Sequence, residues 1–284
     1  MAKNGLVLEG GGMRGLFTVG VLDAFMEADL SFDCCLGVSA GATHGASFVS
    51  GQPGRNKRVM LDYINDPRYF GLGNLLREGN IFGTAFAYEE VPNRLVPFHY
   101  EDFYGSSTDF AVGITDCETG NGVFLDHRDC REDILDVLRA SCSLPFVARP
   151  VTIRGRQYMD GGISVPIPVD QARERGCGKL VVVLTRPEGY RKAPSGATAL
   201  ARVVYRKYPG LVETMETRHE RYNETLERLE DEHRRGTLFL LRPETSNPVA
   251  RLEKDTAKLE TLYREGLAAG RASLPQLKRY LQQT

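Results

Sequence analysis

The sequence predicts an α/β protein, a three-layer α/β/α sandwich around a mostly parallel central sheet. Short apolar runs of strand character alternate with segments whose apolar residues recur at helical spacing. The run 180–184 is apolar throughout, as expected of a strand that is covered by helices on both faces. The turn-forming residues 118–122 join two further strands, which predicts an antiparallel hairpin attached to the parallel sheet.

A βαβ unit is predicted at the start of the chain. Residues 6–8 form an apolar strand that runs into the glycine-rich loop 9–15, and apolar residues then recur through 16–26 at helical spacing. A second strand, 32–38, ends in Gly-x-Ser-x-Gly, and the small or apolar residues that follow, towards residue 49, predict a helix. Both loops are therefore expected at the same edge of the sheet, where ligands bind in folds of this kind.

The alternation continues up to residue 185, apart from one stretch. Residues 69–98 are rich in Gly, Asn, Phe and Leu with weak periodicity, and we expect a mobile cap or loop region with short helices that walls an apolar pocket. The other predicted elements are, in order, a helix at 55–65 ended by Pro67, strands at 109–115 and 123–125, a helix at 134–142 stopped by Pro145, a strand at 157–159, a helix at 169–175 and the strand at 180–184.

The last third of the chain is more polar. Residues 186–198 predict a surface loop, 211–235 a long charged helix ended by Gly236, 238–241 a last strand, and the leucines from residue 252 onward a final helix. The charged helix mixes both signs, which is typical of a solvated helix with ion pairs between residues i and i+4. Docking to a partner or to a lipid headgroup surface is the alternative for this helix.

The composition favours an ordinary globular protein. Of the 284 residues, 42% are hydrophobic and 26% are charged, and the net charge of -1 gives no argument for binding nucleic acid. The sequence contains no run of about 18 apolar residues that would span a membrane. Residues 1–4 lead directly into a strand, which leaves no room for an export signal, so we expect a cytoplasmic protein with six reduced cysteines. The cysteines and histidines lack ligand spacing, so no zinc or calcium site is expected.

The five residues from Gly37 to Gly41 are the candidate nucleophile site, with Ser39 at their centre. Strand, then Gly-x-Ser-x-Gly, then helix is the context of a nucleophile elbow, in which a sharp turn forces the serine into a strained backbone conformation. Gly37 and Gly41, two residues to either side, let strand and helix come close without a side-chain clash. A chance match is the alternative, because Gly and Ser are common in turns.

The glycine loop matches Gly-x-Gly-x-x-Gly at Gly10, Gly12 and Gly15, between a strand and a helix. A dinucleotide site would also need an acidic residue at the end of the second strand, to hold a ribose. That strand ends in the serine motif instead, and Asp33 precedes the strand. The phosphate-binding pattern that ends in Gly-Lys-Ser/Thr is absent as well, so a nucleotide-binding protein is a distant alternative.

The same loop also has the properties of an oxyanion hole. Gly10, Gly11 and Gly12 would expose backbone N–H groups at a helix N-terminus, where the dipole favours negative charge. Such donors stabilise the oxyanion that forms when a serine attacks an ester, by roughly 3–4 kcal/mol each. Arg14 would add positive charge or hold the carbonyls of the loop.

Ser39 needs a general base, and the histidines are poor candidates. His219 and His233 lie within the charged helix, and His44 is five residues beyond the serine, where a buried or capping role is expected. Asp160 follows a predicted strand, and Gly161 and Gly162 after it suit a tight loop that a substrate can approach. An ordinary Asp-Gly turn is the alternative for this aspartate.

Taken together, these motifs resemble the patatin-like phospholipases. The matching blocks are the glycine loop 10–15, the serine motif 37–41, the Ala-Ser-x-x-x-Pro segment 140–145 and the Asp-Gly-Gly of residues 160–162, and together they cover about residues 5–170. The first block of the family often begins with an aspartate, whereas this chain has Glu9. We therefore predict a catalytic core at 5–170, with 171–284 as the remainder of the same α/β domain.

The resemblance implies a Ser-Asp dyad. Ser39 corresponds to the nucleophile of the family, Asp160 to its base, and the loop from Gly10 to Gly15 to its oxyanion hole, and no metal or cofactor is carried over. The implied activity is hydrolysis of fatty-acyl esters in phospholipids, lysophospholipids or related lipids, with transient contact to a membrane surface. A soluble carboxylesterase or thioesterase and a non-catalytic lipid-binding regulator are the alternatives. Acyl length, headgroup, bond position and oligomeric state do not follow from the sequence.

Overall fold

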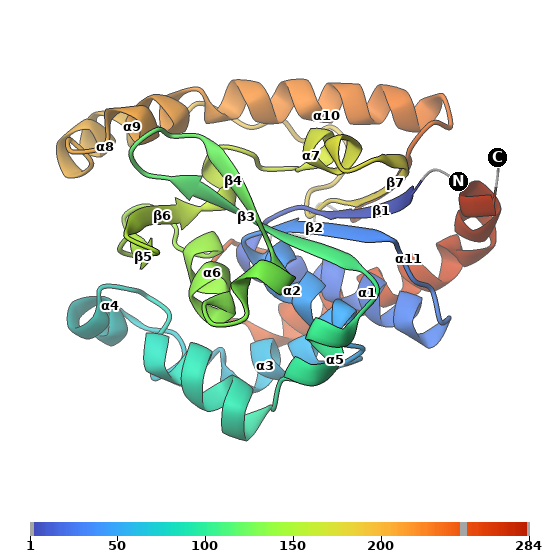
Figure 1. Cartoon of the computed structure of the whole chain (residues 1–284), viewed down its shortest axis with the longest axis horizontal. Coiled ribbons are helices and arrows are strands. Elements are labelled where there is room, and N and C mark those ends of the chain that lie inside the picture. The colour runs from blue at the N-terminus through green and yellow to red at the C-terminus, as the bar shows by residue number, and fades with distance from the viewer. Residues whose placement is uncertain (1–2, 245–248, 283–284) are drawn as a thin grey trace.

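The computed structural model describes residues 3–244 and 249–282, and its centre is one mixed sheet (Figure 1). Within these residues the strand order is β5-β6-β3-β2-β1-β7-β8, and β4 pairs with β3 outside this path. Strands β1, β2, β3, β7 and β8 pair in parallel, whereas β4, β5 and β6 pair antiparallel. The predicted α/β class with a mostly parallel sheet and an attached hairpin is confirmed. The strands are β1 (Lys3–Leu8), β2 (Cys34–Val38), β3 (Asp109–Asp116), β4 (Gly122–Asp126), β5 (Val151–Ile153), β6 (Arg156–Asp160), β7 (Cys177–Val183) and β8 (Phe239–Leu241).

Helices cover both faces of the sheet. In Figure 1, α7 and α10 lie above it, and α1, α2, α6 and α11 lie below it. The α-helices are α1 (Leu16–Glu27), α2 (Ala40–Val49), α3 (Arg55–Tyr63), α4 (Leu72–Glu78), α5 (Tyr100–Gly105), α6 (Ile134–Ser141), α7 (Val169–Glu174), α8 (Thr198–Val204), α9 (Pro209–Glu216), α10 (Arg218–Arg234) and α11 (Thr256–Gln282). Shorter helical turns occupy Gly12–Gly15, His127–Cys130 and Gly161–Ile163, and a π-helix spans Phe86–Leu95.

Alternation along the strands separates two apolar cores. On β1, Leu6 and Leu8 belong to the larger core under α1 and α2, while Val7 belongs to the smaller core with residues of α7 and α10. The larger core is closed by α11, which packs tightly on α1. A Cβ on Gly266 would lie only 2.0 Å from Phe17 O, so only glycine permits this approach of the two helices.

One predicted element needs correction, and several short elements were not predicted. The helix predicted over 211–235 is two helices, α9 and α10, because the chain leaves helical geometry at Thr217 (φ -91°, ψ 3°). The short strand β5 and the helices α5 and α8 were not predicted, since each is only a few residues long and lacks a clear period. The other predicted elements are confirmed and differ only at their ends.

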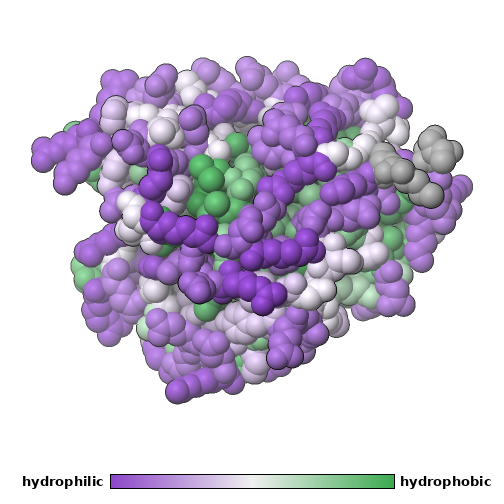
Figure 2. Space-filling view, viewed as in Figure 1, coloured by the Kyte–Doolittle hydropathy of each residue, from purple (hydrophilic) through white to green (hydrophobic). Residues whose placement is uncertain are grey.

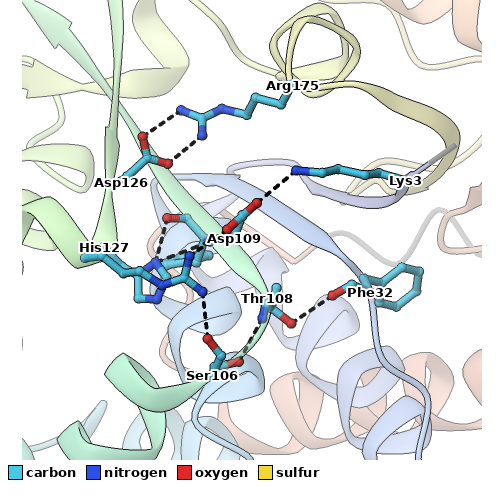
Figure 3. Close-up of polar contacts among 10 residues, drawn as sticks. Lys3, Phe32, Ser106, Thr108, Asp109, Asp126, His127 and Arg175 are labelled. Atoms are coloured by element: carbon cyan, nitrogen blue, oxygen red, sulfur yellow. Dashed lines mark hydrogen bonds and ion pairs between the residues drawn. The ribbon is translucent and has the colours of Figure 1, made fainter. Parts of the chain in front are cut away.

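A network of polar contacts fastens the strands at the amino end of β3 (Figure 3). Lys3 Nζ pairs with the carboxylate of Asp109 at 3.0 Å, and Arg175 pairs with Asp126. Thr108 Oγ1 donates to Phe32 O at 2.8 Å, which ties the start of β3 to the segment before β2. The charged groups at this end of the sheet are therefore paired with one another. The predicted site lies at the other end.

Candidate active site

Strand register brings Ser39 and Asp160 to the same place. Val38 of β2 pairs with Gly113 of β3, and the next residue of β3, Ile114, pairs with Asp160 of β6. Ser39 follows Val38, so the serine and the aspartate meet across β3. On the other side of β2, Leu8 pairs with Gly37, so the glycine loop after β1 starts beside the serine.

The predicted elbow is confirmed in its backbone geometry. Ser39 has φ 54° and ψ -129°, a strained conformation for a residue with a side chain, and α2 begins at the next residue. A Cβ on Gly41 would lie 2.5 Å from Leu8 O, so the glycine is needed for the close approach of α2 to the end of β1. Strain of this kind is typical of functional sites.

Ser141, at the end of α6, holds the elbow in place. The backbone N–H of Ser39 donates to Ser141 Oγ at 2.7 Å, and Ser141 Oγ donates to Gly113 O at 2.7 Å. This gives the Ala-Ser-x-x-x-Pro block a structural role. It also means that the amide of Ser39 is already engaged, so any oxyanion donors have to come from elsewhere.

The carboxylate of Asp160 is buried and only partly satisfied. Its Oδ1 accepts a hydrogen bond from Gly162 N at 2.8 Å, while Oδ2 has no hydrogen-bond partner in the described part of the chain. Burial raises the pKa of Asp160 above its ordinary value, and this rise is opposed by the Ser39 hydroxyl, by the charge of Arg218, by the Gly162 amide and by Arg251. A raised pKa makes an aspartate a better base near neutral pH. Gly161 is required here, because a Cβ on it would lie 2.1 Å from Gly113 O.

The glycine loop forms one wall of a polar cavity beside these two side chains. Gly10, Gly11 and Gly12 line this cavity together with Ser39 and Asp160. Among the described residues, nothing accepts a hydrogen bond from the amides of Gly10 and Gly11. Free donors at the start of a helical turn are what an oxyanion hole needs.

Two residues of the glycine loop 10–15, Arg14 and Gly15, do not contribute through their backbone N–H groups. Gly15 does not line the cavity but packs against His44, whose Nε2 would lie 2.5 Å from a Cβ at that position. The side chain of Arg14 lines the polar cavity, and its Nε has no partner among the described residues. Arg14 therefore contributes charge and does not hold the loop carbonyls. Burial and the nearby Arg186 and Arg251 lower its pKa to about 10.

No histidine of the described chain lines the polar cavity. His44 is buried on the other side of the elbow, and burial lowers its pKa to about 3, so it is neutral. His219 lies on α10 with its Nδ1 3.1 Å from Glu216 O, and His233 lines a separate hollow near the end of α10. Asp160, which lines this cavity together with Ser39, therefore stays the candidate base.

An apolar cavity of about 150 Å³ lies on the other side of Ser39. Both Ser39 and Leu144 line it as well as the polar cavity, which measures about 30 Å³. As predicted, the stretch 69–98 forms part of an apolar wall. Its contributors are Tyr69, Phe82, Ala87, Tyr88, Val91, Pro92 and Phe98.

The charged helix α10 reaches the site, although its mixed charge pattern had indicated a solvated helix. Arg218 Nε donates to Gly162 O beside the candidate base, and the hydroxyl of Tyr222 donates to Glu9 Oε1 at 2.7 Å. Glu9 also accepts from the backbone N–H of Thr185 at 2.6 Å. The solvated-helix interpretation therefore holds only for the outer side of α10. Arg218 and Tyr222 are four residues apart and so share one helical face, a signal that could have been noticed.

The described residues contain neither a cluster of metal-ligand side chains nor a helix that could span a membrane. No cluster of three or more His, Cys, Asp or Glu side chains that could hold a metal ion occurs within residues 3–244 and 249–282. Within the same residues, no helix is both long and apolar enough to pass through a bilayer.

Comparison with known proteins identifies the family. The family model of the patatin-like phospholipases matches residues 6–173, more than half of the chain. The chain belongs to this family. A second model, that of a domain of unknown function, matches residues 208–282 of this patatin-like protein. The predicted division of the chain at residue 170 stays a prediction.

Relatives of this patatin-like protein agree with the assignment. It is 35% identical over 188 residues to an uncharacterized protein, YjjU, of Escherichia coli, covering 64% of this chain and 52% of the relative. It is 26% identical to the mouse 1-acylglycerol-3-phosphate O-acyltransferase Pnpla3, covering 48% of this chain and 33% of the relative. It is 27% identical to the lysophospholipase NTE1 of Eremothecium gossypii, covering 63% of this chain and 12% of the relative. The chain thus spans about half the length of YjjU and smaller shares of the other two relatives.

Among solved structures, VipD from Legionella pneumophila shares the fold. The match has a TM-score of 0.50 at 12% sequence identity and covers 97% of this chain and 67% of that one. Similarity at this level of identity concerns the fold alone.

Proposed function

We propose that this protein is a serine acyl hydrolase that cleaves fatty-acyl esters of phospholipids, lysophospholipids or related lipids through a Ser39–Asp160 dyad. The observation that carries the proposal is the buried, unpartnered Oδ2 of Asp160 in a cavity that it shares with Ser39 and that no described histidine lines. Family membership and relatives named as lysophospholipases support a lipid ester as the substrate class.

The proposed reaction has two steps. Asp160 takes the proton of the Ser39 hydroxyl as the serine oxygen attacks the ester carbonyl, and the amides of Gly10 and Gly11 stabilise the oxyanion. The ester bond breaks, the proton passes to the departing alcohol, and an acyl group stays on Ser39. Asp160 then accepts a proton from a water molecule that attacks this acyl group. The fatty acid leaves and Ser39 regains its hydrogen.

The two cavities suggest how the substrate lies. The apolar cavity would take the acyl chain, and the polar cavity would take the alcohol part, because Ser39 lies between them. Exposed Leu72 and Leu76 on α4 follow Tyr69 of the cavity wall and would provide an apolar contact with a lipid surface. On the face drawn in Figure 2 the surface is largely hydrophilic, with a hydrophobic area near its middle, where β4 lies in Figure 1.

The test is hydrolysis of a p-nitrophenyl acyl ester and of lysophospholipid by the wild type and three variants. Ser39→Ala and Asp160→Asn should each remove nearly all turnover, whereas His219→Ala should keep it. If Asp160→Asn kept most of the activity and His219→Ala lost it, a triad would replace the dyad. Activity on short soluble esters alone would favour a carboxylesterase or thioesterase. Lipid binding without turnover would favour a regulator.

A further inference from the structure

The polar cavity beside Ser39 is lined by an excess of positive charge. Among the described residues that line it, two are carboxylates, Glu9 and Asp160, so the five cationic side chains leave a formal net charge of +3. The cations come from four separate segments of the chain, and they are Arg14, Arg186, Lys192, Arg218 and Arg251.

None of these five side chains forms an ion pair with a described residue, although ion pairs are common elsewhere in the molecule. Glu9 is occupied by Thr185 and Tyr222, and Asp160 accepts from the Gly162 amide. At the opposite end of the sheet, by contrast, Lys3 and Arg175 are both paired (Figure 3). The cavity thus holds cations for which the described chain supplies no ion pair; Arg186 and Lys192 lie over the rings of Tyr190 and Tyr222 instead.

The most deeply buried of these cations is also unsatisfied. Arg14 is only 9% exposed, and its Nε has no hydrogen-bond partner in the described chain. A buried guanidinium without a partner is costly, and its fork of N–H donors matches a phosphate or carboxylate.

Mutual repulsion among the cations also indicates that the cavity binds an anion. Burial lowers the pKa of Lys192 to about 7, with Arg218, Arg251 and Arg14 adding to the shift. Burial and Arg251 likewise lower the pKa of Arg218. Like charges gathered in a partly buried cavity destabilise one another unless an anion neutralises them.

We propose that this cavity is a subsite for a phosphate group carried by the alcohol part of the substrate ester. The inference rests on the proposed function: with the acyl chain in the apolar cavity and the carbonyl at Ser39, the alcohol portion enters the cationic cavity. Its lining of five cationic side chains against two carboxylates suits a compact dianion such as a terminal phosphate. A phosphate that carries a quaternary ammonium group would be disfavoured, because its positive charge meets the cations of the cavity.

The test compares kcat/KM on three substrates with the same acyl chain: a monoacylglycerol, the corresponding acylglycerol phosphate and the corresponding lysophosphatidylcholine. The acylglycerol phosphate should be preferred by at least about tenfold over either of the others. Arg186→Gln should reduce this preference several-fold, Arg186→Lys should restore part of it, and Arg234→Gln, exposed near the far end of α10, should leave it unchanged. Equal rates on the three substrates would overturn the proposal.

A binding experiment separates this inference from the proposed function. Inorganic phosphate should raise the melting temperature of the wild type more than that of Arg186→Gln, whether or not the protein hydrolyses esters. If phosphate stabilises both proteins equally, as a general salt effect would, the subsite is contradicted even if ester hydrolysis is found. Specific binding of free phosphate without preference for the acylglycerol phosphate would contradict the assignment to the substrate.

Discussion

The backbone amide of Ser39 donates a hydrogen bond to the hydroxyl of Ser141, 2.7 Å away. Ser141 is completely buried, and its hydroxyl donates a hydrogen bond to Gly113 O. A single hydroxyl therefore connects α6, the elbow and β3. The strained φ of Ser39 is thus maintained partly by a residue 102 positions later in the chain. Backbone strain at a functional site persists only where the surroundings enforce it in this way.

Replacing Ser141 should loosen the elbow. Ser141→Ala leaves the Ser39 amide and the Gly113 carbonyl without their partner, which costs about 1–3 kcal/mol of stability per unsatisfied group. The matched control is Ser143→Ala, which removes only a bond to Arg139 O. Urea denaturation should show both variants destabilised, while ester kinetics should show a fall in kcat for Ser141→Ala alone. Equal kcat in the two variants would contradict a positioning role for Ser141.

Replacing Glu9 with aspartate, the residue that often begins the first block of the family, should destabilise this protein. Its carboxylate bridges Thr185, beyond the end of β7, and Tyr222 of α10, and the shorter side chain cannot reach both. Glu9→Asp should therefore cost about 1–3 kcal/mol. In a double-mutant cycle with Tyr222→Phe, measured by denaturant unfolding, the two losses should not be additive. Full additivity would mean that the Glu9–Tyr222 bond contributes nothing.

His44 should make the protein sensitive to acid. Burial lowers its pKa in the folded chain to about 3, against an ordinary value of 6.5, so the unfolded chain binds a proton first as the pH falls. The contribution of the neutral His44 to the free energy of unfolding is fully present above pH 6.5. It is lost progressively as the pH falls towards 3, by roughly 5 kcal/mol in total. His44→Gln, which does not titrate, should flatten the plot of unfolding free energy against pH between 6.5 and 4. An unchanged slope would show that His44 is not buried as a neutral ring.

The apolar cavity should limit the length of the acyl chain in the substrates that the protein hydrolyses. Ala87 lines it from the π-helix Phe86–Leu95, so Ala87→Phe should shorten the usable space. The ratio of kcat/KM for p-nitrophenyl decanoate to that for the butyrate should fall by about tenfold, because several methylenes lose their burial. Ala85→Phe, at an exposed neighbouring position, is the control. A parallel fall in both variants would place the acyl chain elsewhere.

The parts of the fold and the site that depend on local pattern could be predicted from the sequence. The elbow at Ser39, the glycine loop and the Asp160 turn are each fixed within a few residues of chain, and the alternation of apolar segments gave the sheet. Apart from Arg14, the cations of the polar cavity could not be found in this way. Arg186, Arg218 and Arg251 reach the cavity from a loop, a helix and the segment before α11, and only tertiary packing brings them together. In the sequence, only its spacing of four residues from Tyr222 separates Arg218 from its solvated neighbours.

The most direct test of the central claim is the rate and position of labelling by a fluorophosphonate, followed by intact mass and peptide mapping. The dyad predicts one adduct, on Ser39, that forms at least about a hundredfold more slowly in Asp160→Asn. An adduct on another serine, or an equal rate of labelling in Asp160→Asn, would contradict it.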